Sequence, residues 1–256
     1  MAVSSDSAEA GRRLLPRLSM ATENYLLSIF QLEEQGISVT STQLAEQLKR
    51  LPVGEGLGTS LPSVGGMLRR MIREGLIQTT PSKDVVLTDK GRLSAHSIVR
   101  RHRLAERMVV DLLGLELHKA HVEAHRLEHA ISPDVEEKIS ARLGNPATCP
   151  FGHPIPGSGY VAAADAAPLR DVRQGQRLVV DRVPEDDQAL LEYFVANGLV
   201  PGQTVEVVEA APYRGIIKLM CNDKEVALGY EVAERIWVRG AAADPARPRE
   251  RSAAQG

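Results

Sequence analysis

The order of apolar and polar positions predicts helices and a hairpin in the first hundred residues. Residues 22–35 (TENYLLSIFQLEEQ), 39–50 and 62–75 repeat apolar residues every three or four positions, the period of an amphipathic helix. Residues 77–91 (IQTTPSKDVVLTDKG) read as two short strands around a turn. Helix, turn, second helix and hairpin are typical of a winged helix-turn-helix, whose second helix enters the major groove of DNA.

The local charge favours a DNA-binding face in this region. Ten Lys or Arg residues and five Asp or Glu residues lie between Ser41 and Arg101. We expect phosphate contacts from Lys49, Arg69 and Arg70, and the alternative is that the arginines form a solvated helix face. The candidate DNA-binding residues are Lys49, Ser60, Pro62, Ser63, Arg69 and Arg70.

The rest of the chain predicts more helices and then a small β domain. Residues 88–113 read as one long helix, a second begins near Glu116, and a third covers 132–144. Their surplus of apolar residues predicts a helical dimer interface. Short alternating strands after residue 176, interrupted by one helix at 186–198, predict a small barrel.

The fold class is therefore mostly α with small β, a winged helix-turn-helix followed by a helical dimerisation domain and a small C-terminal β-barrel. The expected parts are a disordered N-terminal tail (1–19), the winged helix-turn-helix (20–94), the helical metal-binding and dimerisation domain (95–156), a linker (157–175), the barrel (176–240) and a disordered tail (241–256).

Composition narrows the class of protein. The 256 residues carry a net charge of −2, which excludes a uniformly basic nucleic-acid binder but not a local basic face. Cys149 and Cys221 form no CxxC pair, which fits a reducing compartment without a disulfide framework. No apolar run has the length of a membrane span. We expect a soluble, cytoplasmic protein with no membrane partner.

Histidines concentrate in one segment, HKAHVEAHRLEH, which holds four of the seven in the chain. On a helix, residues three and four apart share a face, so their side chains point roughly one way. Imidazole nitrogens and carboxylate oxygens together suit first-row divalent ions. The residues with this spacing are His118, His121, His125, Glu128 and His129, joined by His102 and Glu106 on the preceding helix.

Two other functions stay open for these histidines. The stretch His125, Glu128 and His129 fits H-x-x-E-H, the inverted zincin motif, in which a glutamate is the general base of a zinc metallopeptidase. That enzyme needs a further ligand and a large peptidase fold, whereas about 127 residues follow here. We therefore predict that the protein is not an enzyme. The second alternative is a winged-helix regulator that senses an organic ligand.

Four segments resemble the diphtheria toxin repressor family, the iron- and manganese-dependent winged-helix repressors. They are TENYLLSIFQLEEQGI, LTDKGRLSAHSIVRRHRLAERMVVDLLGL, HKAHVEAHRLEHAIS and CPFGHPIPG. The later strands look like the SH3-like third domain of the longer members. The resemblance implies a homodimer that binds palindromic operator DNA when loaded with Mn²⁺ or Fe²⁺ and represses genes of metal homeostasis.

The family's metal sites can be placed on this chain residue by residue. The resemblance implies an ancillary site of His102, Glu106 and His121, to which the third domain adds Glu185 and Gln188, and a primary site of Asn24, His125, Glu128 and His129. The resemblance therefore implies two metal sites in each subunit.

This chain departs from the family's pattern in two places. Where iron-type members of the family have a Met and a Cys as ligands, this chain has Asn24 and His125. The loss of both sulfur ligands favours manganese. About nine extra residues, LPVGEGLGT, separate the helices of the helix-turn-helix, and Gly65 and Gly66 lie on the recognition helix. Since glycines offer no side chain to read bases, we expect contacts from the long loop or readout of DNA shape.

Overall fold

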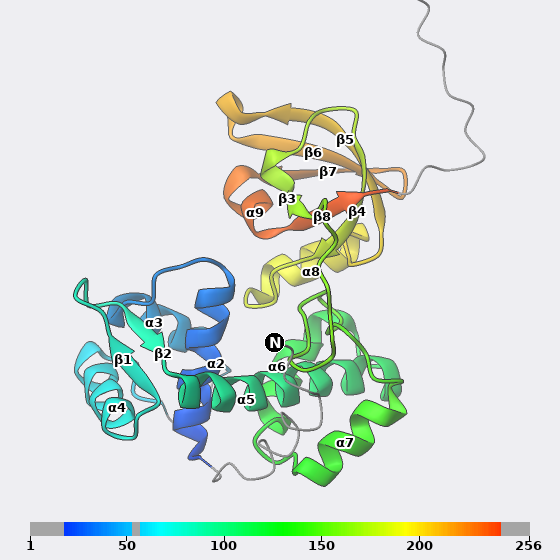
Figure 1. Ribbon diagram of the computed structural model, residues 1–256. Helices are drawn as coiled ribbons and strands as arrows, with labels where there is room; N and C mark the ends of the chain where they lie inside the picture. The colour runs from blue at the N-terminus through cyan, green and yellow to red at the C-terminus, as the bar shows by residue number, and fades with distance from the viewer. Residues whose placement is uncertain (1–17, 53–56, 242–256) are drawn as a thin grey trace, which may run out of the picture. The chain divides into compact units, whose positions relative to one another are not determined.

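The computed structural model describes residues 18–52 and 57–241, which form two compact units (Figure 1). The first unit comprises Met1–Val161 together with Pro184–Val195, and the second comprises Ala162–Val183 and Ala196–Gly256. Both predicted tails lie almost entirely outside the described residues, as does part of the LPVGEGLGT insertion. The segment Pro184–Val195 belongs to the first unit, although the residues before and after it belong to the second.

Three helices and a wing make up the N-terminal part of the first unit. They are α2 (Met20–Glu34), α3 (Ser41–Lys49), α4 (Leu61–Arg73), β1 (Ile77–Thr79) and β2 (Val85–Leu87). Ser19 caps α2 by accepting a hydrogen bond from the backbone N–H of Thr22, so the helix begins two residues earlier than predicted. Thr40 and Gln43 form a capping box at α3, and Ser60 caps α4.

The wing and helix α5 (Asp89–Arg107) are attached to the same core. Strands β1 and β2 pair antiparallel with Ile77 opposite Leu87, and both side chains are buried. At the start of α5, a Cβ added to Gly91 would lie 1.8 Å from the carbonyl oxygen of Leu76. Only glycine fits this close approach, which places α5 directly against the winged helix-turn-helix.

The remaining helices of the first unit carry the histidine-rich segment. Helix α5 continues into a π-helical turn, Met108–Leu112, and a 3₁₀ turn, Leu117–Lys119, leads into α6 (Ala120–Leu127). Helix α7 (Pro133–Arg142) follows, and Ser132 caps it by accepting a hydrogen bond from the backbone N–H of Val135. Helix α5 packs against both α2 and α6. Helical spacing had been predicted to include Glu128 and His129, but α6 ends at Leu127 with Glu128 as its C-cap, so both residues lie in the following turn.

The second unit is built on a six-stranded antiparallel sheet in the order β3-β8-β4-β5-β6-β7. The strands are β3 (Ala167–Pro168), β4 (Arg177–Arg182), β5 (Thr204–Ala211), β6 (Ile216–Cys221), β7 (Lys224–Gly229) and β8 (Trp237–Gly240). Strand β3 falls in the stretch predicted as linker, and helix α9 (Tyr230–Arg235) was not predicted. The predicted interrupting helix is α8 (Gln188–Asn197). Among the described residues, no helix has the length and apolarity to span a membrane.

Candidate functional site

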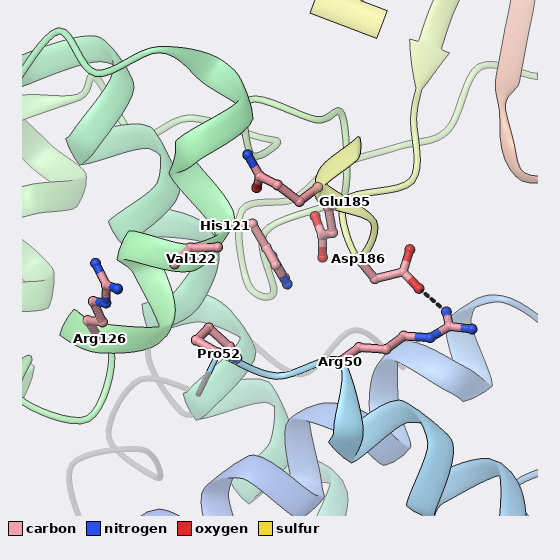
Figure 2. Close-up of a pocket in the computed structure, with 8 residues that line it drawn as sticks. Arg50, Pro52, His121, Val122, Arg126, Glu185 and Asp186 are labelled. Atoms are coloured by element: carbon pink, nitrogen blue, oxygen red, sulfur yellow. Dashed lines mark hydrogen bonds and ion pairs between the residues drawn. The ribbon is translucent and has the colours of Figure 1, made fainter. Parts of the chain in front are cut away.

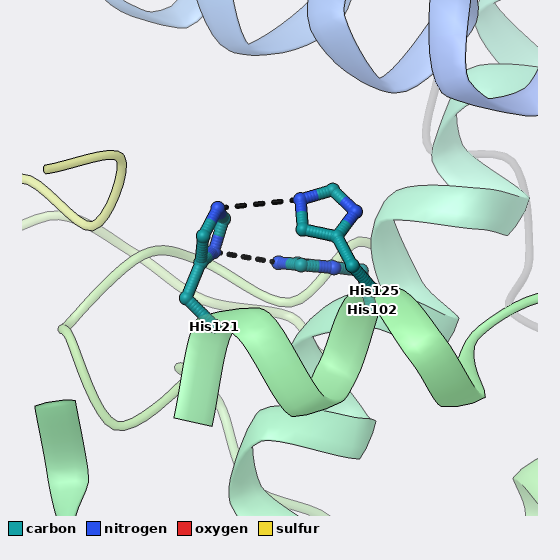
Figure 3. A group of neighbouring side chains, drawn as sticks. All are labelled: His102, His121 and His125. Carbon is teal, nitrogen blue, oxygen red and sulfur yellow. Dashed lines mark hydrogen bonds between the residues drawn. The ribbon is translucent and has the colours of Figure 1, made fainter. Parts of the chain in front are cut away.

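One group of side chains in the first unit has the composition of a metal site. Helix α5 supplies His102 and Glu106, one turn apart, and α6 supplies His121. His102 Nε2 lies 3.0 Å from Glu106 Oε1 and 3.1 Å from His121 Nδ1. Figure 3 shows His125 beside His102 and His121, and its Nε2 lies 3.3 Å from His121 Nε2. Helical spacing places His102 beside Glu106 and His121 beside His125, and the packing of α5 against α6 brings the two pairs together.

Glu185 completes this group although it is distant in sequence. Ligand atoms of His102, Glu106, His121 and Glu185 all lie within 4.8 Å of one another. The Glu185 carboxylate is held in place by Gln31 of α2, whose Nε2 donates to Oε1 over 3.2 Å in a buried hydrogen bond. Gln188 is not in the group: its side chain is exposed and donates to Glu192.

His125, Glu128 and His129 form the second half of the site. Glu128 Oε1 lies 3.4 Å from His125 Nδ1 and 3.3 Å from His129 Nε2. Glu128 Oε2 lies 2.5 Å from His102 Nδ1, so His102 connects the two halves. Asn24 is fully buried on α2. His118, in the 3₁₀ turn before α6, is in neither candidate group of ligand atoms.

Two charged residues beside this second half, Glu23 and Arg101, were not predicted from the sequence. Glu23 Oε2 accepts a hydrogen bond from His129 Nδ1 at 2.6 Å, and Glu23 Oε1 accepts one from Arg101 Nη2 at 2.6 Å. Arg101 also donates to the Glu128 carbonyl oxygen at 3.0 Å. Both side chains are buried. The available signal was the position of Glu23 next to the candidate ligand Asn24, in the first turn of the same helix.

The charges in the site stabilise one another. Burial alone would lower the pKa of His102, but the carboxylates of Glu106 and Glu128 raise it well above its usual value. Burial alone would raise the pKa values of Glu106 and Glu128, but the surrounding histidines lower both. Burial lowers the pKa of His125 to about 4, so this ring is neutral at pH 7 and its lone pair is available to a ligand.

The donor set fits a divalent cation. Glu106 Oε2 and Glu128 Oε1 are buried and accept no hydrogen bond from any residue that the structure describes. Burying such oxygens is energetically unfavourable unless a hydrogen-bond donor or a cation interacts with them. Ligand atoms of one ion bound at about 2.0–2.2 Å are at most about 4.4 Å apart, so the group around Glu185 needs only small rotations. Nitrogen and oxygen ligands together suit first-row divalent ions.

A pocket reaches this group from solvent (Figure 2). Its volume is about 220 Å³, and His121 and Glu185 belong both to its wall and to the candidate ligand set. Arg50, at the end of α3, crosses to Asp186 with a 2.6 Å ion pair. The pocket thus offers an entry route for a small ion between the histidine helix and the segment that carries Glu185.

The predicted DNA-binding residues lie on α3, on α4 and at its N-terminus. Lys49 is paired with Glu46 at 2.6 Å, and Arg70 is paired with Glu74 at 2.7 Å. Ser60 caps α4 and its hydroxyl lies 2.9 Å from that of Ser63, while Pro62 occupies the first turn. Arg69 is exposed, and within the described ranges it forms no ion pair or hydrogen bond.

Comparisons with known proteins agree with this arrangement. Residues 88–157 match the family described as "Iron dependent repressor, metal binding and dimerisation domain", and residues 167–240 match the FeoA domain. The chain is 35% identical over 230 residues to the iron-dependent repressor IdeR of Mycobacterium leprae, covering 85% of this chain and 96% of that one. It is 39% identical over 228 residues to the diphtheria toxin repressor of Corynebacterium glutamicum, covering 85% and 95%.

A solved structure shares the fold. A manganese-dependent transcriptional repressor in complex with manganese superposes with a TM-score of 0.75 at 32% identity, covering 86% of this chain and all of that one. The fold and site thus define a metal-dependent winged-helix repressor with a C-terminal FeoA domain. The chain belongs to the diphtheria toxin repressor family, as the sequence predicted. These relatives are transcriptional repressors and not enzymes, which leaves the peptidase alternative without support.

Proposed function

We propose that this chain is a homodimeric, cytoplasmic repressor that binds palindromic operator DNA when loaded with Mn²⁺ or Fe²⁺, and that it controls genes of metal homeostasis. The observation that carries the proposal is the group of His102, Glu106, His121 and Glu185, whose ligand atoms come from three separate segments and lie within 4.8 Å. The relatives are named for dependence on iron or manganese, which supports the same class of cofactor.

The ligands are assigned to two sites in each subunit. The first set is His102, Glu106, His121 and Glu185, with Gln188 in an outer position because it lines the same pocket as His121 and Glu185. The second set is Asn24, His125, Glu128 and His129. The short distances from Glu128 to both histidines support this second set.

The ligand chemistry favours manganese over iron. Neither set contains a sulfur ligand, and oxygen-rich sites suit harder cations. Cys149 is close, with its Sγ 3.8 Å from Glu185 Oε2. However, burial and the carboxylates of Glu106 and Glu185 raise the pKa of this thiol well above its usual value. A raised pKa disfavours the thiolate, which is the form of cysteine that binds metals.

Two residues of the DNA-binding part, Gln31 and Glu23, form hydrogen bonds with candidate metal ligands. Gln31 of α2 donates to Glu185 and accepts a hydrogen bond from Gln47 of α3 at 3.5 Å. Glu23 of α2 holds His129. A bound divalent cation supplies the positive charge that keeps these carboxylates and imidazoles together. The arrangement of α2 and α3 against α5 and α6 is then favoured over others, since only a difference in affinity between two arrangements can shift their populations.

The free energy needed to shift the population between two arrangements can be estimated. Moving a 1:99 mixture of arrangements to 99:1 needs about 10⁴-fold preference, or roughly 5.5 kcal/mol. Two sites with ligands from several segments can supply this. In a dimer, two copies of α4 would then be presented about 34 Å apart, one turn of DNA, to a palindromic operator. The assigned contacts are Lys49, Ser60, Pro62, Ser63, Arg69 and Arg70.

The test is a selection of DNA by the purified, chelator-treated protein. Duplexes are selected from a randomised library with and without Mn²⁺, and binding of the selected duplex is then titrated with Mn²⁺, Fe²⁺ and Zn²⁺. We expect a palindrome with Mn²⁺ and none without it. Glu106→Gln should raise the Mn²⁺ needed for half-maximal binding by at least about 10-fold. The control is Glu116→Gln, which changes an exposed glutamate paired with Lys119.

An organic effector is the competing function. The pocket beside His121 measures about 220 Å³, which is below the roughly 300–1,000 Å³ of typical small-molecule sites. Its wall includes four charged side chains, those of Arg50, Arg126, Glu185 and Asp186. Equal DNA binding with and without chelator would favour the organic effector and contradict the metal-dependent repressor.

A further inference from the structure

One face of α4 points away from the core and is almost free of side chains near its start. Val64, Leu68 and Met71 are buried. At about 100° per residue, the opposite face carries Pro62, Gly66, Arg69 and Arg73, with Gly65 at its edge. All of these are exposed or half-buried, in agreement with this assignment.

The two glycines leave their surface to the Arg69 side chain. In a helix each Cα–Cβ bond tilts toward the N-terminus, so a long side chain covers the surface three and four positions before its own Cα. Arg69 follows this rule. Its Nη1 lies 3.4 Å from the position of a Cβ on Gly65, and its Nη2 lies 3.9 Å from that of a Cβ on Gly66. The guanidinium therefore occupies the place where side chains of residues 65 and 66 would project.

The neighbouring cations are already engaged. Lys49 pairs with Glu46, and Arg70 pairs with Glu74 through its Nε. Arg69 is exposed and has no such partner in the part of the chain that the structure describes. Arg73 lies one turn further from the N-terminus of α4, at its last residue. Among these cations, only Arg69 combines an unengaged guanidinium with a position over the N-terminal half of the helix.

We propose that Arg69 is the base-reading residue of α4 and that it recognises a guanine in each operator half-site. The proposal rests on the proposed function, since it requires DNA binding by α4. N-terminal residues of a recognition helix contact base edges in the major groove. Guanidinium N–H groups donate two hydrogen bonds to guanine O6 and N7, the commonest specific contact. This assignment replaces the phosphate contact that the sequence alone led us to expect for Arg69.

The experiment compares Arg69→Ala with Arg73→Ala in the Mn²⁺-loaded full chain. Each variant removes one positive charge from the exposed face of the same helix, and alanine favours helix. Circular dichroism and a Mn²⁺ titration check that the fold and the metal response are retained. Each protein selects duplexes from the randomised library, and affinities are then measured for the wild-type consensus and for duplexes changed at each guanine, over a range of salt concentrations.

We expect the wild type to prefer guanine at one symmetric position of each half-site by about 5- to 150-fold. Arg69→Ala should lose this preference and leave the other positions unchanged, and Arg73→Ala should keep it while weakening all sequences alike. A consensus without such a guanine, or an Arg69→Ala protein that retains the preference, would overturn the proposal while the repressor function stands. If the wild type enriched no sequence, both the base-reading role and the repressor function would be overturned.

Discussion

The ion pair of Glu23 and Arg101 provides a sharp test of how the DNA-binding part is attached to the metal site. Glu23 lies on α2, Arg101 lies on α5, and their side chains are 8% and 10% exposed at a distance of 2.6 Å. The same carboxylate accepts a hydrogen bond from His129. The change Glu23→Gln keeps the shape of the side chain but removes its charge. Arg101 would then remain buried without a counter-charge from Glu23.

Two effects of this change can be given a size. Breaking a buried ion pair by removing one charge costs about 3–5 kcal/mol, and we expect about 3 kcal/mol because glutamine retains one hydrogen bond. For a chain of this size that corresponds to a fall in melting temperature of about 6–12 °C. Residues that orient a histidine ligand typically contribute 10- to 100-fold to metal affinity, so Mn²⁺ binding should weaken by about that factor.

The matched control is Glu33→Gln on the same helix. Glu33 pairs with Arg92 at 3.0 Å, but these side chains are 22% and 46% exposed. Exposed pairs contribute about 0–1 kcal/mol, so this variant should behave like the wild type. Thermal unfolding of chelator-treated protein measures stability, and competition with a fluorescent chelator measures Mn²⁺ affinity.

The outcomes separate the two roles of Glu23. If Glu23→Gln matches Glu33→Gln in both measurements, the pair is not buried in solution and the reasoning fails. If the melting temperature falls while Mn²⁺ affinity stays at the wild-type value, Glu23 is structural and does not orient a ligand through His129.

Four further outcomes are expected. His129→Ala should abolish Mn²⁺-dependent binding of the selected duplex with an unchanged circular dichroism spectrum, and wild-type affinity would refute its role as a ligand. Asn24→Ala should raise the Mn²⁺ needed for binding, and an unchanged titration would remove Asn24 from the ligand set. The selected duplex should tighten Mn²⁺ binding by the same factor by which Mn²⁺ tightens DNA binding, and unequal factors, measured by calorimetry, would contradict the coupling. Burial alone would raise the pKa of Glu34, but His153 and Arg103 lower it to about 2 from the ordinary 4.5. The lowered pKa corresponds to a contribution of about 3 kcal/mol to the free energy of unfolding. This contribution is complete above pH 4.5 and is lost as the pH falls toward 2. Urea unfolding should therefore show that Glu34→Gln is less stable than the wild type at pH 7 and equally stable near pH 2.

The sequence by itself determined the local elements and most of the first candidate ligand group. The helices α2, α3 and α4 follow from apolar periodicity and from capping residues, both of which act over a few positions. Helical spacing likewise places His102 beside Glu106 and His121 beside His125. These features could be predicted because the interactions that create them join residues close in sequence.

Only the tertiary structure decided which distant residues join them. Gln31 and Glu185 are 154 positions apart, and Glu23 and His129 are 106 apart, so no local pattern links them. The end of α6 at Leu127 is also seen only in the folded chain. Buried carboxylates must find positive or hydrogen-bonding partners wherever the packed chain supplies them, and packing brings those partners from other segments.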